Sequence, residues 1–98
     1  MSRENTEIVG AVEALLFVSD EPVTASRVAK ILDVSASAVE GALKMLAAEY
    51  AEENRGFQLR EVAGGWRLYT HPAYHSYVEE YVLSWDTRRL SQAALEAL

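Results

Sequence analysis

Apolar residues recur at helical spacing through the first half of the chain and predict three helices. The first is expected to begin after Thr6, a suitable N-cap, and to end near Val18. Thr24 is expected to cap a second, short helix, and Ser35 a third that reaches about Glu53. The residues expected to face the core are Ile8, Val9, Val12, Leu15 and Leu16, then Val28, Ile31 and Leu32, then Val39, Ala42, Leu43, Leu46 and Tyr50.

A period of two replaces the helical period in Phe57–Thr70, which predicts two short strands joined by a turn at Gly64–Gly65. In that register Glu61 lies opposite Leu68. An isolated hairpin is marginal in water, so its apolar face is expected to pack on the helices. One face carries Phe57, Leu59, Trp66 and Leu68, and the other carries Gln58, Arg60, Val62, Arg67 and Tyr69.

The order of these elements predicts the fold class. The tight turn Asp33–Ser35 makes a helix-turn-helix of the second and third helices. With one helix before it and a hairpin after it, the chain is expected to form a mainly α, winged helix-turn-helix domain.

The last third of the chain predicts a fourth helix and the beginning of a second domain. Pro72 suits the first position of that helix, and Trp85–Arg89 reads as a linker. Ser91 can cap a further amphipathic segment, so we expect a winged-helix domain over 1–87 and the first turns of a second domain over 88–98. The fourth helix carries one apolar arc, formed by Tyr74, Tyr77, Val78, Tyr81 and Val82.

Composition and charge then limit the classes of function that the chain can have. The 98 residues include no cysteine, which excludes disulfides and thiolate metal sites. The longest apolar run, Ala14–Val18, is too short to cross a bilayer and follows no secretory signal, so a cytoplasmic protein is expected. The formal net charge is −6, which disfavours nucleic-acid binding unless a local basic patch exists.

Catalytic motifs are missing from the sequence. Gly64–Gly65 lacks the following helix and lysine of a phosphate-binding loop, and no nucleophile elbow occurs. His71, His75 and Glu79 are spaced four apart and in principle could hold a metal, but no fourth ligand is evident and solvated polar residues are the simpler reading. We therefore expect neither enzymatic activity nor a cofactor.

A winged helix most often suggests DNA recognition, and this remains the alternative function. A DNA-binding transcriptional regulator would use Ser37, Lys44, Arg60 and Arg67. The start of the third helix, however, offers serines, small apolar residues and a glutamate where base contacts need Arg, Lys, Asn or Gln. The predicted wing tip carries no basic residue either, so direct sequence-specific DNA binding is not expected.

Protein interaction is the favoured function, because two Trp and five Tyr are many for so short a chain. In-phase positions place Trp66 and Tyr50 in the core, whereas core and interface positions both stay open for Tyr69 and Trp85. A small, mostly uncharged strip on the first helix could instead allow another chain to approach closely, although partial cover by the domain itself would explain it as well. The candidate contact residues are Gly10, Ala14 and Phe17 of that strip, Tyr69 on the outer hairpin face, and Tyr81 and Trp85 near the end of the fourth helix.

Three segments carry a resemblance to a known family: EALLFVSDEPVT over Glu13–Thr24, LREVAGGWRLYTHPAY over Leu59–Tyr74, and RRLSQAALEAL over Arg88–Leu98. They resemble segregation and condensation protein B, the partner of a kleisin in the bacterial SMC condensin. The three segments match in order and at the family's spacing, so the resemblance covers essentially the whole chain. The resemblance implies two tandem winged-helix domains, of which this chain is the first, and a non-enzymatic role in chromosome condensation and segregation. It also implies homodimerisation through the amino-terminal domain, and contact with the kleisin, which bridges the SMC heads, mainly through the second domain.

Overall fold

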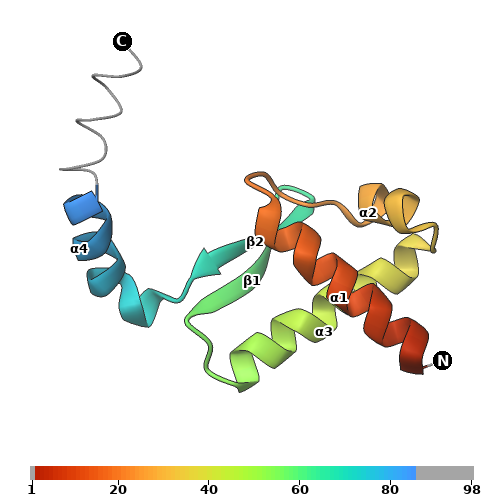
Figure 1. Ribbon diagram of the computed structural model, residues 1–98, viewed down its shortest axis with the longest axis horizontal. Helices are drawn as coiled ribbons and strands as arrows, with labels where there is room; N and C mark the ends of the chain where they lie inside the picture. The colour runs from red at the N-terminus through yellow and green to blue at the C-terminus, as the bar shows by residue number, and fades with distance from the viewer. Residues whose placement is uncertain (1, 86–98) are drawn as a thin grey trace, which may run out of the picture.

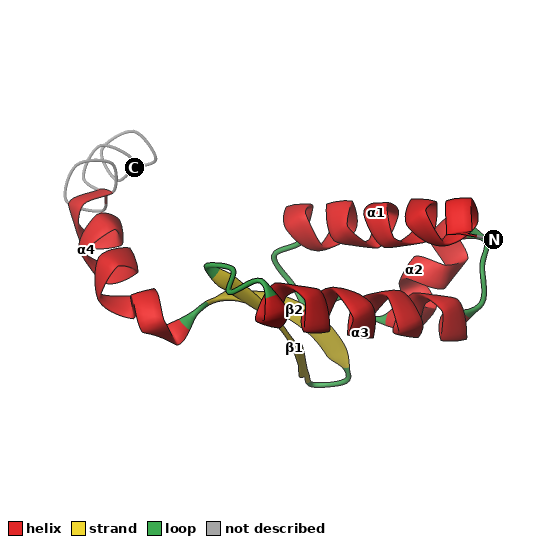
Figure 2. Cartoon of the chain, turned by 90° about the horizontal axis from the view of Figure 1, so that it is seen from below, coloured by secondary structure: helices red, strands yellow, loops and turns green. Residues whose placement is uncertain are grey.

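The computed structural model describes residues 2–85 and confirms a winged helix-turn-helix (Figure 1). Three helices pack together, and a two-stranded antiparallel hairpin lies at one end of them, with a last helix beyond it (Figure 2). The elements are α1 (Ser2–Val18), α2 (Ala25–Leu32), α3 (Ala36–Glu52), β1 (Phe57–Val62), β2 (Gly65–Thr70), the 3-10 turn η1 (Pro72–Tyr74) and α4 (His75–Trp85).

The first helix begins earlier than its sequence pattern predicts. Thr6 is not its N-cap, because α1 starts at Ser2. The residues before Thr6 include neither Gly nor Pro, the two residue types that most strongly interrupt a helix. Without a breaker, the helix extends by about one more turn.

The helix-turn-helix forms as its capping residues predict. The Thr24 Oγ1 accepts a hydrogen bond from the Arg27 N–H at 3.3 Å, and the Ser35 Oγ accepts one from the Ala38 N–H at 3.1 Å. Between these caps, Asp33 adopts a left-handed conformation with φ of 59° and ends α2. This turn fixes the direction in which α3 leaves α2.

The core is centred on α3, against which α1, α2 and β1 pack. All five predicted core residues of α3 are buried, as are Val12 and Leu16 of α1 and Val28 of α2. The prediction that Ile31 faces the core is wrong, since its side chain is 62% exposed. The inner side of the eight-residue α2 is occupied instead by two alanines and Val28, which leaves Ile31 at the edge. The buried residues are Val12, Leu16, Ala25, Val28, Ala29, Val39, Ala42, Leu43, Leu46, Tyr50, Leu59 and Trp66.

The hairpin keeps its predicted faces, but its turn lies one residue earlier than predicted. Ala63 and Gly64 are the turn residues, with φ of 47° and 79°, and Glu61 is opposite Trp66 rather than Leu68. The paired residue numbers change by two, so the side-chain parity is preserved. Leu59 and Trp66 are buried against the helices as expected.

Gly65 has a different role from the predicted one, because it permits a close approach between β2 and the segment before α2. A Cβ at Gly65 would lie 3.0 Å from Pro22 Cβ and 3.1 Å from the Val23 carbonyl oxygen. Val23 pairs with Trp66 in an isolated antiparallel bridge, with both N–H···O distances at 2.7 Å. The hairpin is thereby attached to the α1–α2 connection as well as to α3.

The fourth helix stands apart from the domain (Figure 1). It does not begin at Pro72, because Pro72–Tyr74 forms a 3-10 turn and α4 starts at His75. Within residues 2–85, its main contacts are with this turn. The predicted apolar arc of α4 is therefore largely exposed. The predicted linker beyond Trp85, the cap at Ser91 and the second domain lie outside the described residues.

Candidate interaction surfaces

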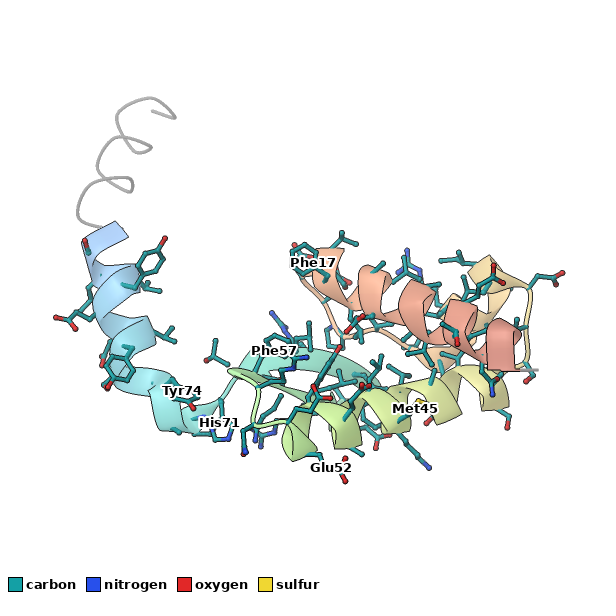
Figure 3. All side chains as sticks on the ribbon, turned by 60° about the horizontal axis from the view of Figure 1, so that its bottom comes forward. Phe17, Met45, Glu52, Phe57, His71 and Tyr74 are labelled. Atoms are coloured by element: carbon teal, nitrogen blue, oxygen red, sulfur yellow. The ribbon has the colours of Figure 1, made fainter. Side chains whose placement is uncertain are left out.

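The small-residue strip of α1 lies on the surface of the domain. Gly10, Ala14 and Phe17 are all exposed, and Phe17 is 82% exposed at the carboxyl end of α1 (Figure 3). Apart from the neighbouring residues and backbone of α1, no atom of the described residues would lie within 4 Å of a Cβ added at Gly10. The domain does not cover this strip, which keeps it available for a contact with another chain.

A buried tyrosine fixes α1 to α3 beside this strip. The Tyr50 hydroxyl donates a hydrogen bond of 2.6 Å to Oε2 of Glu13. Burial, and then the hydrogen bond and negative charge of Glu13, raise the pKa of Tyr50 well above its ordinary value. The ring of Phe57 meets Tyr50 edge to face, with ring centroids 4.9 Å apart, so this contact also joins the hairpin. Tyr50 is thus a core residue, as its periodicity predicts.

A second apolar surface was not expected from the sequence. A groove of about 520 Å³ separates the end of α1 from α2, and Val18 and Ile31 at its walls are strongly exposed. Both residues have the apolar character of core positions, so periodicity alone gives no signal that they face outward. The groove is lined by Leu15, Val18, Ser19, Asp20, Glu21, Pro22, Val23, Thr24, Arg27, Val28 and Ile31.

The outer face of the hairpin combines an aromatic residue with two cations. Tyr69 is half-buried, and the guanidinium carbon of Arg60 lies 5.4 Å from the centre of its ring. Arg67 is directly opposite Arg60 in the strand pairing, and both arginines are exposed. This face is the basic patch of the hairpin, set back from the turn at Ala63 and Gly64.

The fourth helix supplies the remaining candidate residues. Tyr81 is 74% exposed, and Tyr77 on the same helix is 70% exposed. Trp85 is the last residue of α4, and its side chain lies outside the described part of the chain. The fold therefore does not bring the candidates into one patch: the α1 strip lies on the three-helix body, Tyr69 on the hairpin, and Tyr81 on the projecting helix.

The surface of α3 offers little to a DNA duplex. Ser37, Gly41 and Lys44 are exposed, as expected for its outer side. Lys44 is a single cation there, and apolar Met45 next to it is half-exposed (Figure 3). Phosphate contacts by several Lys or Arg residues normally supply most of the affinity for DNA. The arginines that could serve in this way, Arg60 and Arg67, lie on the hairpin.

The histidine pair does not form a metal site. His71 precedes the fourth helix as expected, and its Nδ1 accepts a hydrogen bond of 3.0 Å from the Ala73 N–H, which caps η1. Within the described residues, no three His, Asp or Glu side chains gather in a way that could hold a metal ion. Over the same range, no helix has the length and apolar character needed to cross a membrane.

Sequence comparison identifies relatives over nearly the whole chain. The family model of the segregation and condensation complex subunit ScpB matches residues 10–98. The chain is 42% identical over 93 residues to segregation and condensation protein B of Oceanobacillus iheyensis, and 41% identical over 93 residues to that of Halalkalibacterium halodurans. These alignments cover 94% of the chain but 48% and 47% of the two relatives, so the chain spans about half the length of the curated relatives that it matches.

Solved structures give the same result. ScpB from Mycobacterium tuberculosis superposes with a TM-score of 0.81 at 36% identity, over 94% of this chain and 57% of that one. A structure described as a dimer of the ScpB N-terminal domain complexed with ScpA peptide superposes with a TM-score of 0.72 at 31% identity, over 78% of this chain and 95% of that one. The resemblance expected from the three sequence segments is thus confirmed, and the chain belongs to the segregation and condensation protein B family.

Proposed function

We propose that this chain is a non-enzymatic interaction domain that homodimerises within a bacterial SMC–kleisin condensin and acts in chromosome condensation and segregation. The observation that carries this proposal is the set of large apolar side chains that the domain leaves exposed, on a chain with a net charge of −6. Exposed apolar surface of this kind marks protein contacts, whereas the charge disfavours nucleic acid. Such a complex works in the cytoplasm, at the chromosome.

The partners follow from the family. The similar N-terminal domain is described as a dimer with a bound ScpA peptide, which supports homodimerisation here and contact with a kleisin. The resemblance implies a kleisin contact mainly through a second domain, whereas that complex supports some contact by the amino-terminal domain itself. The SMC heads would then be reached through the kleisin. We retain Gly10, Ala14, Phe17, Tyr69, Tyr81 and Trp85 as candidate dimer contacts.

Co-expression of a tagged and an untagged copy tests self-association directly. At equal expression and with random pairing in dimers, affinity purification is expected to recover about one untagged copy for every two tagged copies. Ala14→Arg should reduce recovery of the untagged copy if the α1 strip is a dimer contact, because a charge would enter a close apolar approach. Ala48→Arg, at an exposed position on α3, is the matched control. Equal recovery with both variants would remove the α1 strip from the dimer interface.

DNA binding is kept as a second candidate because Arg60 and Arg67 form a basic pair on the hairpin. It predicts a mobility shift of duplex DNA that weakens steeply as salt rises and that Arg60→Glu abolishes. The absence of any shift at low salt would end this alternative.

A further inference from the structure

The helix α4 receives little support from the rest of residues 2–85. Over this range, α4 contacts chiefly the 3-10 turn before it. Packing of an apolar face normally supplies most of the stability of a helix in a protein. Yet the two tyrosines of its predicted arc, Tyr77 and Tyr81, are 70% and 74% exposed. Residues 2–85 thus leave these two tyrosines uncovered, and they offer an apolar face to a second surface.

The outer hairpin face carries two positive charges side by side. Arg60 and Arg67 are directly opposite each other on adjacent strands, and like charges in this arrangement destabilise a hairpin. Both are exposed, and the ion pair found within the described residues joins Arg55 to Glu53 instead. A carboxylate placed between the two guanidinium groups would remove this repulsion.

The helix α4 carries a carboxylate, Glu80, at the border of its exposed tyrosine face. Glu80 follows Tyr77 by three residues and precedes Tyr81, so it borders the exposed tyrosine face, whereas Glu79 points about 100° further round the helix. No Lys or Arg occurs between His75 and Trp85. The tyrosine face with its acidic border thus complements the hairpin face in both charge and chemistry, since tyrosine rings can also accept arginine stacking.

The two surfaces do not meet within one chain. The arginines are exposed, and α4 leads away from the hairpin after Thr70 (Figure 1). A groove of about 370 Å³ also remains open beside Arg60, lined in part by Ala47, Ala51 and Pro72. Apolar walls next to a cation would suit an entering tyrosine.

We propose that α4 of one copy docks on the outer hairpin face of a second copy, with Glu80 between the partner's Arg60 and Arg67. This inference rests on the proposed homodimer and specifies its contact. A two-fold dimer repeats the contact twice, so each copy gives its α4 and receives the other. Tyr77 and Tyr81 then lie against the hairpin and the groove beside it.

Charge exchange between the two surfaces tests this contact. Arg60→Glu combined with Arg67→Glu should weaken the homodimer at least about tenfold in Kd, because like charges would face each other. Glu80→Arg should weaken it similarly. The controls are Glu79→Arg, the same change on another side of α4, and Lys30→Glu at an exposed position on α2. Both should retain the wild-type Kd. Circular dichroism and urea unfolding of each variant check that the domain is folded.

Mixing the two weakened variants gives the decisive result. The copy with Arg60→Glu and Arg67→Glu has an acidic hairpin, and the copy with Glu80→Arg has a basic group on α4, so the contact between these two surfaces regains opposite charges. Native mass spectrometry should show a heterodimer in excess over either homodimer. The inference is overturned if the wild-type chain dimerises but both weakened variants keep its Kd, or if mixing restores nothing. A monomeric wild-type chain would instead overturn the proposed homodimer itself, and loss of duplex DNA binding with an unchanged dimer would assign the arginine pair to DNA.

Discussion

Because the hairpin closely approaches the α1–α2 connection at Gly65, we expect Gly65→Ala to lower the free energy of unfolding substantially. The new Cβ would lie 3.0 Å from Pro22 Cβ, 3.1 Å from the Val23 carbonyl oxygen and 3.3 Å from the Pro22 carbonyl carbon, where ordinary contacts begin at 3.4 Å. None of these atoms can move away at low cost. Pro22 is a rigid ring, and the Val23 oxygen accepts the 2.7 Å hydrogen bond from Trp66.

The hairpin would have to shift by a few tenths of an ångström, away from this bridge. Overpacking of this kind costs about 1–3 kcal/mol of the free energy of unfolding. For a domain of this size, each 1 kcal/mol lowers Tm by about 4–8 °C. We therefore expect Gly65→Ala to unfold at a clearly lower temperature and urea concentration than the wild-type chain.

Gly41→Ala is the matched control for the same chemical change. Gly41 is exposed in α3, and its added Cβ would meet no atom within 4 Å. Alanine there should raise stability by about 0.5–1 kcal/mol, because glycine is a poor helix former. Urea unfolding followed by circular dichroism measures both variants. If Gly65→Ala proved as stable as the wild-type chain, the close packing of β2 on Pro22 and Val23 would be refuted.

Two further predictions concern the core. Leu43→Ala should lower the free energy of unfolding by about 2–5 kcal/mol, whereas Met45→Ala, two residues away and half-exposed, should change it little; equal losses in urea unfolding would contradict the assigned orientation of α3. Tyr50→Phe removes the hydrogen bond to Glu13 and should cost about 0.5–1.5 kcal/mol near neutral pH. Because the folded pKa of Tyr50 is raised, its contribution is complete below the ordinary pKa of 10.0 and is lost as the pH rises from there towards the folded pKa. The stability of the wild-type chain relative to Tyr50→Phe should therefore fall as the pH rises above 10.0, and a constant difference across this range would contradict the burial of the hydroxyl.

Local signals in the sequence were sufficient for most of the fold. Thr24 and Ser35 define the starts of α2 and α3 because a capping side chain acts within three residues of itself. The alternation of apolar and polar residues in the hairpin predicts both of its faces. The faces are correct although the turn lies one residue earlier than predicted, because side-chain parity is preserved. That error arose because Gly64–Gly65 looked like the turn, although Gly65 is needed for contact with Pro22, which is distant in the sequence.

Tertiary effects explain what the sequence did not reveal. The position of Ile31 on α2 is apolar and in phase, yet neighbouring elements do not reach it. Tertiary packing also decides the candidate surfaces. Phe17 and Tyr81 are exposed because no neighbouring element of the described residues covers them. The bridge between Val23 and Trp66 likewise joins residues that are far apart in the sequence, and no local pattern signals it.

The mass of the wild-type chain in solution tests the central claim most directly. Sedimentation equilibrium over a range of concentrations should give a species of twice the 10.9 kDa chain mass, which dissociates on dilution. A mass of 10.9 kDa at every concentration, including the high micromolar range, would contradict the assignment of this chain as a homodimerising domain.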